Sequence, residues 1–193
     1  ECFSIAGCGD FMSRLEPDRS LALAEYVSTM GPTGMTAYFG FFDVWKPKAG
    51  DEVLVSAAGG AVGSVVGQLS KIAGCRTVGI SSSDEKCRWL TDTLGYDGAI
   101  NYNAAEGLPA QIARQLPNGF DIYFDNVGGS MLDAAMQHMK EHARIVLCGA
   151  ISQYDRMAQP PAVYHMWEFI PKRATAAGFM FSDYFADYPA ALA

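Results

Sequence analysis

The stretch AAGGAVGSVVG, residues 57–67, has the glycine spacing of a turn that binds the phosphates of a dinucleotide. The apolar run at 52–57 precedes it and valines at helical spacing follow it, which predicts a strand, a glycine turn and a helix. Gly60 lets the backbone approach a pyrophosphate, and Gly63 lets the helix lie close to the strand. The helix start offers free N–H groups and the positive end of its dipole. The residues that we predict to bind a pyrophosphate are Gly60, Ala61, Val62 and Gly63.

Ala58 stands where the GxGxxG pattern usually has its first glycine. Alanine at position 57 or 58 costs little if the turn keeps φ negative there, because only a left-handed residue strictly requires glycine. We therefore expect a variant of the dinucleotide turn. A tight turn without a ligand is the alternative.

A binding site for NAD usually has Asp or Glu at the end of the second strand, where the acid accepts hydrogen bonds from the ribose. Asp84 lies about that far from the glycines, but the strand expected at 76–81 ends before it. Ser82 and Glu85 have the spacing of a helix capping box, which places Asp84 in the first turn of a helix. The strand end therefore offers hydroxyl groups rather than a negative charge.

Lys86 follows these serines one turn into the expected helix. A lysine and small hydroxyl donors suit a 2′-phosphate, because charge-assisted hydrogen bonds favour an anion. We predict NADP(H) as the cofactor, with Ser82, Ser83 and Lys86 around its 2′-phosphate. A solvated surface lysine is the alternative for Lys86.

The elements that must position these residues alternate between short β-branched runs and helical segments. The expected strands are 52–57, 76–81, 98–102, 120–127, 144–149 and 175–181, and the expected helices are 60–74, 83–95, 104–116 and 129–140. This alternation predicts an α/β fold, a doubly wound parallel six-stranded Rossmann sheet with helices on both faces. Ligands of such sheets bind at the carboxyl ends of the strands.

The chain has 193 residues, 50% of them hydrophobic, and a net charge of −7. This acidity argues against nucleic acid or an anionic membrane as a partner, because such binding needs clustered Lys and Arg. No apolar run reaches the ~18 residues that a membrane helix needs. The five cysteines form no CxxC pair, so we predict no metal site. We expect a cytoplasmic protein.

Charged residues make up 18% of the chain, whereas soluble domains typically have ~25%. We therefore expect part of the surface to meet a further domain or a second subunit. The chain begins at Glu1 and stops within an expected helix, so we interpret it as a piece of a longer protein.

Motifs along the chain carry a resemblance to a known family. They include GMTAYFG, KPKAGDEVLVSAAGGAVGSVVGQLSK, SSDEKCRWL, INY, DIYFDNVGG, RIVLCGAISQY and GFMFSDY. In these motifs the sequence resembles the zinc-independent medium-chain dehydrogenase/reductases. Among them it resembles the NADPH-dependent double-bond reductases, a group that includes prostaglandin reductase (leukotriene B4 12-hydroxydehydrogenase), plant alkenal reductases and bacterial curcumin reductase.

The resemblance implies a larger, homodimeric enzyme whose substrate lies between two domains. Residues 1–30 would be the tail of a GroES-like catalytic domain that is mostly absent here, and 31–181 the Rossmann NADP-binding domain. Residues 182–193 would begin a C-terminal helix that returns to the catalytic domain.

The resemblance also implies further site residues. Tyr102 would join Lys86 at the 2′-phosphate, and Asn126 would touch the cofactor where the fourth strand ends. The residues along the nicotinamide half would be Cys148, Gly149, Ala150, Ile151, Ser152, Gln153 and Tyr154, with the backbone of Phe179, Met180 and Phe181 near the nicotinamide amide. Tyr154 is the tyrosine that we expect to be catalytic.

The implied reaction is hydride transfer from NADPH to the β-carbon of an α,β-unsaturated ketone or aldehyde, with hydroxyl donors rather than zinc stabilising the enolate. The proton donor stays open, because the sequence departs near Pro171 from relatives that have a tyrosine there. An NADPH quinone reductase and a non-catalytic NADPH-binding protein are the alternatives. We expect the 193 residues alone to bind nucleotide without useful turnover.

Four other side chains have structural interpretations. We expect Asp125 to cap the following helix and Cys148 to be a small buried hydrophobe. His138 and His142 would be exposed at a helix end, where the dipole favours them.

Overall fold

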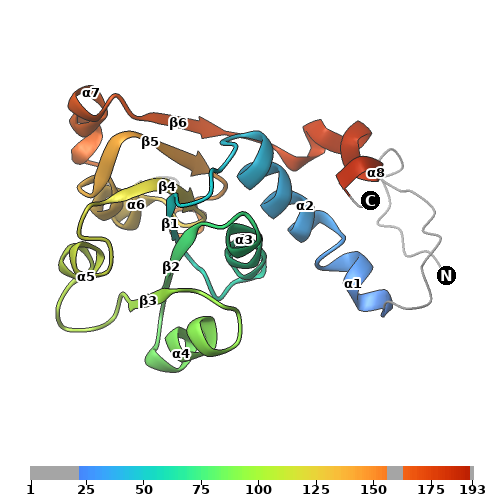
Figure 1. Cartoon of the computed structure of the whole chain (residues 1–193), viewed down its shortest axis with the longest axis horizontal. Helices are drawn as coiled ribbons and strands as arrows, with labels where there is room; N and C mark the ends of the chain where they lie inside the picture. Colours follow the sequence, from blue (N-terminus) through green and yellow to red (C-terminus); the bar gives the residue numbers. More distant parts are fainter. Residues whose placement is uncertain (1–21, 156–162, 192–193) are drawn as a thin grey trace.

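The computed structural model describes residues 22–155 and 163–191. Residues 1–21, most of the segment that we expected to be the tail of a preceding domain, lie outside these ranges, as do residues 192–193. The described residues form a sheet flanked by helices, with a group of short helices at one end (Figure 1).

Six strands form the sheet. They are β1 (Glu52–Val55), β2 (Arg76–Ser81), β3 (Gly98–Asn101), β4 (Phe120–Asp125), β5 (Met139–Leu147) and β6 (Thr175–Gly178). They pair in the order β3-β2-β1-β4-β5-β6, and every pair is parallel. The predicted doubly wound sheet is confirmed. The order reverses between β1 and β4, and a sheet of this type binds its ligand at that point.

Helices cover both faces of the sheet (Figure 1). They are α2 (Pro32–Tyr38), α3 (Ala61–Ile72), α4 (Asp84–Asp92), α5 (Leu108–Gln115) and α6 (Gly129–Met136). Buried residues of α2, α3 and α4 pack in one core cluster, and those of α5 and α6 in the other. Along β1, Leu54 belongs to one cluster and Val53 and Val55 to the other, because successive strand residues point to opposite faces. The two core layers therefore fix β1 and the turn that follows it.

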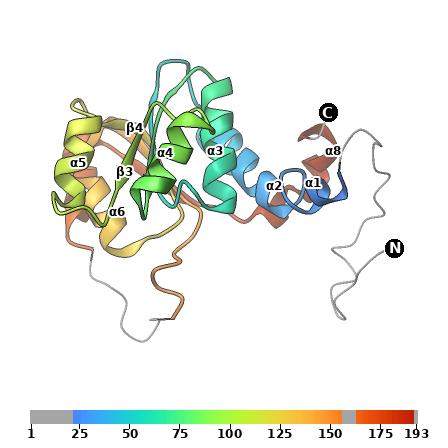
Figure 2. The same ribbon diagram turned by 90° about the horizontal axis from the view of Figure 1, so that it is seen from below.

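Short helices gather at one end of the molecule, where α1, α2 and α8 lie together (Figure 2). They are α1 (Leu23–Val27), the π-helix η2 (Phe39–Asp43), the 3-10 helix η4 (Phe181–Asp187) and α8 (Tyr188–Ala191). The buried ring of Phe39 stacks on Tyr184, with centroids 4.4 Å apart, and on Tyr188, with centroids 5.8 Å apart. This aromatic stack joins η2 to η4 and α8, the last two described elements. None of the helices in the described ranges is long and apolar enough to cross a membrane.

The helix expected at 129–140 is too long. The helix α6 ends at Met136 and β5 begins at Met139, because Met139 pairs with Phe120 and this pairing overrides the helix-forming composition. His142 is exposed but lies inside β5 at a φ of 62°. His138 is half-buried, and burial lowers its pKa. The interpretation of both as exposed histidines at a helix end is therefore wrong.

The chain after β5 also differs from the expectation. A 3-10 helix, η3 (His165–Glu168), and a short α7 (Phe169–Lys172) lead into β6, which ends at Gly178 rather than at residue 181. The C-terminal helix expected from residue 182 is a 3-10 helix before it becomes the single α-turn of α8.

Candidate cofactor site

The glycine turn lies between β1 and α3, at the carboxyl end of the sheet. A Cβ atom at Gly63 would lie 2.5 Å from the carbonyl oxygen of Ala57 and 2.8 Å from the Cα of Ala58, so only glycine allows this approach of helix to strand. Gly60 is the N-cap of α3, and no side chain caps that helix start. The first N–H groups of α3 therefore have no side-chain acceptor from a capping residue, and they can bind an anion.

Ala57 adopts a left-handed backbone conformation. Its φ is 46°, in the left-handed region, and its carbonyl accepts a hydrogen bond of 2.8 Å from the N–H of Gly60. The condition under which alanine would cost little, a negative φ, is therefore not met at Ala57. A left-handed alanine costs roughly 1–2 kcal/mol, which the packing of Ala58 in the core must offset.

The charged end of the site lies where β2 meets α4. Ser83 is the N-cap of α4, and its hydroxyl accepts from the N–H of Lys86 at 3.2 Å. The cap is therefore one residue later than the Ser82–Glu85 box that we expected. Asp84 occupies the first turn, as predicted. A Cβ atom at Gly59 would lie 3.4 Å from the Ser81 hydroxyl and 3.9 Å from Cδ of Lys86, so the lysine stem reaches the glycine turn.

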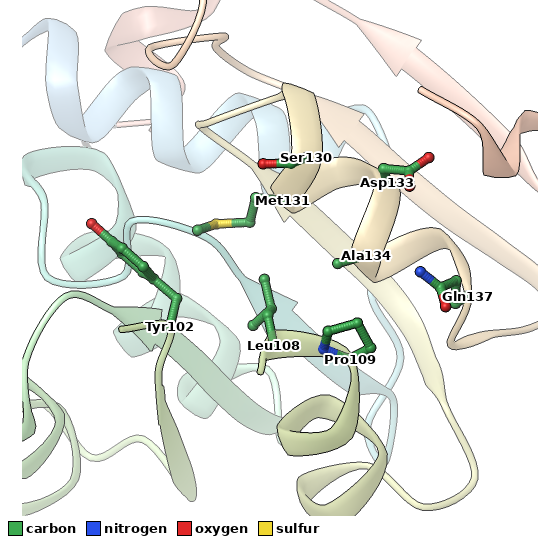
Figure 3. Close-up of a pocket in the computed structure, with 8 residues that line it drawn as sticks. All are labelled: Tyr102, Leu108, Pro109, Ser130, Met131, Asp133, Ala134 and Gln137. Atoms are coloured by element: carbon green, nitrogen blue, oxygen red, sulfur yellow. The ribbon is translucent and has the colours of Figure 1, made fainter. Parts of the chain in front are cut away.

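Tyr102 lies beside these residues, just beyond β3. Its N–H donates to the carbonyl of Ser81 at 3.1 Å, and its side chain is 42% exposed. The ring lines a pocket of ≈ 370 Å³ that α5 and α6 complete with Leu108 and Met131 (Figure 3). The structure thus brings Lys86 and Tyr102 to the same edge of the sheet.

Asp125, the last residue of β4, is 1% exposed, and its carboxylate accepts hydrogen bonds from four donor groups. The hydroxyls of Ser56 and Tyr123 donate to Oδ1 at 3.1 and 2.9 Å. The N–H groups of Val127 and Gly128 each donate to the same oxygen at 3.0 Å. Helix α6 has Gly128 as its N-cap and no side-chain cap. Asp125 therefore caps the turn before the helix, and the expectation that it caps the helix itself is wrong.

Asn126 ties β4 to β1 through Ser56. The N–H of Asn126 donates to the Ser56 hydroxyl, and its Nδ2 donates to the Ser56 carbonyl, both at 2.8 Å. We did not select Ser56 or Tyr123 from the sequence. A hydroxyl residue at the end of an otherwise apolar strand, as in EVLVS, was the signal for Ser56, whereas Tyr123 has the pattern of an ordinary core residue.

The loop 148–154 rests on this turn. The N–H groups of Cys148 and Gly149 donate to the carbonyl of Asp125 at 2.9 and 3.1 Å, and the Ser152 hydroxyl donates to that of Val127 at 2.7 Å. Burial raises the pKa of Cys148 to about 12, so this thiol stays protonated and is not a nucleophile. The half-buried Cys148 follows the end of β5 rather than lying within it.

Tyr154 ends this loop and is 61% exposed. Its hydroxyl oxygen accepts from the N–H of Ala150 at 3.3 Å. Because that oxygen acts as the acceptor, its proton is available to a further acceptor. Gln153 packs against Gly128, where a Cβ atom would lie 2.7 Å from Nε2 of the glutamine.

The segment Phe179–Phe181 leaves the sheet after β6. The Phe179 ring packs on Gly40, where a Cβ atom would lie 2.5 Å from it. Met180 is exposed, and Phe181 begins η4. The Phe179 ring thus packs against the core cluster of the sheet, and the Phe181 ring packs on Phe185.

The strand order and the glycine turn at the end of β1 define a Rossmann-like nucleotide-binding domain. Residues 61–193 match the model of a family described as zinc-binding dehydrogenase. The chain belongs to this family.

The curated relatives of the chain include double-bond reductases, which confirms the predicted resemblance. The chain is 44% identical over 172 residues to a (+)-pulegone reductase of Mentha piperita, with 89% of this chain and 50% of that protein covered. It is 46% identical over 172 residues to a 2-alkenal reductase (NADP(+)-dependent) of Nicotiana tabacum, with the same shares covered. The chain thus spans about half the length of the curated relatives it matches.

A solved structure, CurA of Vibrio vulnificus in complex with NADPH, is similar to the fold. It superimposes with a TM-score of 0.80 at 44% identity and covers 86% of this chain and 51% of that one. At this identity the likeness extends to the sequence as well as to the fold.

The description of the family names zinc, which proteins bind through Cys, His, Asp and Glu side chains. Within residues 22–155 and 163–191, no three His, Cys, Asp or Glu side chains gather in a way that could hold a metal ion. The described residues therefore do not fit a zinc ion.

The buried carboxylate of Asp125 predicts a pH-dependent stability. Burial raises its pKa above the ordinary value of 3.8, although its hydrogen-bond donors lower it. The folded state then keeps a proton that the unfolded state has lost, so stability falls as pH rises from about 4 through the folded pKa. Each unit of difference between the two pKa values corresponds to about 1.4 kcal/mol.

In Asp125→Asn this proton is absent. The free energy of unfolding of the wild type minus that of the variant should therefore decrease over the same pH window and then level off. Denaturant titrations of the full chain at several pH values measure this difference. Asp92→Asn, at the exposed end of α4, is the control and should follow the wild-type curve. Parallel curves for wild type and Asp125→Asn would contradict the prediction.

Proposed function

We propose that this chain binds NADP(H) across the carboxyl ends of its strands. The observation that carries the proposal is the meeting of the Lys86 stem, the Ser81 hydroxyl and the glycine turn at Gly59. The Trp89 ring lies at the same point, 3.8 Å from a Cβ atom at Gly59. A 2′-phosphate fits there, because the Ser81 hydroxyl and the Lys86 ammonium can donate to it. The names of the relatives support the same cofactor, since one is NADP(+)-dependent and CurA was solved with NADPH.

We assign the parts of the cofactor to three groups of residues. Gly60, Ala61, Val62 and Gly63 bind the pyrophosphate, and Ser82, Ser83, Lys86 and Tyr102 surround the 2′-phosphate. The nicotinamide half lies along Asn126, the loop Cys148, Gly149, Ala150, Ile151, Ser152, Gln153 and Tyr154, and the backbone of Phe179, Met180 and Phe181.

The proposed reaction of the whole protein is reduction of the C=C bond of an α,β-unsaturated ketone or aldehyde. Bound NADPH supplies a hydride for the β-carbon. The Tyr154 hydroxyl, which accepts from Ala150 and keeps its own proton to donate, stabilises the developing enolate oxygen. The protein needs a second wall for its substrate, because the loop 148–154 is open to solvent at Ile151, which is 63% exposed.

We propose the same division of the chain as the resemblance implied. Residues 1–30 belong to a preceding catalytic domain, 31–181 form the NADP-binding domain and 182–193 lead back toward that catalytic domain. The isolated 193 residues would then bind nucleotide without useful turnover.

Lys86→Ala tests the cofactor assignment. Loss of one charge-assisted hydrogen bond should weaken NADPH binding by about ten- to a hundredfold, while NADH, which lacks the 2′-phosphate, binds as before. Dissociation constants from cofactor fluorescence report both effects. Lys71→Ala is the matched control, because Lys71 pairs with Asp97 away from the glycine turn. Equal NADPH affinity in wild type and Lys86→Ala would refute the assignment.

The proposed reaction is tested by NADPH oxidation in the full-length protein. We expect turnover with enones and enals and a product that is saturated between the α- and β-carbons, as mass spectrometry would show. Turnover of quinones alone would favour a quinone reductase of the same superfamily. Cofactor binding without turnover of either class would favour a non-catalytic NADPH-binding protein.

We also propose a zinc-independent, cytoplasmic homodimer that binds neither nucleic acid nor membrane. Within the described ranges β6 pairs with β5 alone, so its other edge is open. The nearby side chains of Tyr164, Trp167 and Ile170 are between 58% and 80% exposed. An open strand edge beside exposed apolar side chains is typical of an interface.

Sedimentation velocity of the full chain tests the dimer. We expect Ile170→Glu to shift the protein toward monomer without lowering its melting temperature, because this side chain is 80% exposed within one chain. A monomer in the wild type at all concentrations would exclude the dimer.

A further inference from the structure

The loops after β2 and β3 are joined by three hydrogen bonds. Tyr102 N–H donates to the carbonyl of Ser81 at 3.1 Å, and Asn103 Nδ2 donates to that of Ser82 at 2.8 Å. Asn101 Nδ2 donates to the carboxylate of Asp84 at 2.7 Å. The first two bonds hold the backbone around the proposed phosphate site. The third holds a negative charge, and the cofactor assignment gives that charge no role.

The amide of Asn101 has a fixed orientation. Its Oδ1 accepts from the N–H of Asn103 at 3.0 Å, and its backbone carbonyl accepts from Nε2 of the buried Gln111 at 2.9 Å. Because Oδ1 is engaged by a donor, the NH₂ group must face Asp84. An aspartate at this position could keep the bond to Asn103 but could not donate to Asp84.

Asp84 and Lys86 point in opposite directions from the start of α4. They are two residues apart, about 200° around a helix. The Lys86 stem reaches toward Gly59 and β1, whereas Asp84 is bound to Asn101 at the end of β3. Because β2 lies between β3 and β1, the two charges are on opposite sides of β2.

We infer that Asn101 is a positioning residue that sets the choice between NADPH and NADH, an inference that rests on the proposed function. Asn101 holds the carboxylate of Asp84 on the β3 side, so a 2′-phosphate beside Lys86 meets a positive charge and hydroxyls. Without that bond the Asp84 side chain can rotate away from β3, which brings its negative charge closer to Lys86. A closer negative charge disfavours a 2′-phosphate relative to a 2′-hydroxyl, in the same sense as the acid near this strand end in NAD sites.

The test measures the dissociation constants of NADPH and NADH for the full chain and three variants. Asn101→Ala should reduce the preference for NADPH about tenfold, the order of one charged interaction at a solvated site. Asp84→Ala/Asn101→Ala should restore the preference, because the freed carboxylate is gone. Asp92→Ala/Asn101→Ala removes another acid of α4 and is the control. Its preference for NADPH should stay as low as that of Asn101→Ala.

The outcomes separate the inference from the proposed function. An unchanged preference in Asn101→Ala, or the same loss in both double variants, overturns the role of Asn101 while NADPH binding stands. A wild type that binds neither nucleotide overturns both.

If Asn101→Ala does not fold, Asn101→Asp takes its place, because it keeps the shape and the bond to Asn103. Asp84→Asn/Asn101→Asp then exchanges donor and acceptor with no change in net charge. It should recover the wild-type preference, and a failure to recover it in a folded protein overturns the inference.

Discussion

The hydrogen bonds accepted by the buried carboxylate of Asp125 hold together the segments that form the site. Asp125 ends β4, where the strand order reverses, and its carboxylate accepts from the Ser56 and Tyr123 hydroxyls and from the N–H groups of the turn at 127–128. Burying a charge is costly unless donors surround it, and here those donors come from both central strands and the turn. The loop 148–154 rests on the same residues, through the carbonyl of Asp125 itself.

The other end of the site depends on how charge is distributed in a short stretch of α4. An acid and a lysine two residues apart would nearly cancel at a flexible surface. The first helical turn separates them, and the amide of Asn101 fixes the acid on one side. The crevice is thus positive at Lys86 although the chain as a whole carries −7. Net charge and local field are different quantities, and binding depends on the local one.

The parallel sheet and the glycine turn could be predicted from the sequence, because they depend on hydrophobic periodicity and glycine spacing. The alternation of elements led to the correct sheet, and Gly63 has the close approach that its position required. The errors occurred where distant contacts decide. Pairing with β4 turned helix-forming residues near Met139 into a strand, and core packing holds Ala57 in a left-handed conformation. Ser56 and Asn101 were missed, because a hydroxyl or an amide acquires its role from a partner far along the chain. Tyr123 was missed because it has the pattern of an ordinary core residue, although its partner Asp125 is two residues away.

The aromatic stack of Phe39 on Tyr184 and Tyr188 has a mechanical consequence. The chain enters the sheet domain through α2 and η2 and leaves it through η4, and rings of η2, η4 and α8 pack together between these segments. Figure 2 shows α1, α2 and α8 close together at this end. The entering and leaving segments are therefore packed on each other, and a displacement of one displaces the other. A displacement of α1 or α8 would reach the sheet through η2. Gly40 of η2 contacts the Phe179 ring, at the proposed nicotinamide end. Along the sheet order, Phe179 at the proposed nicotinamide end is thus closer to this cluster of rings than Lys86, which lies beyond β1.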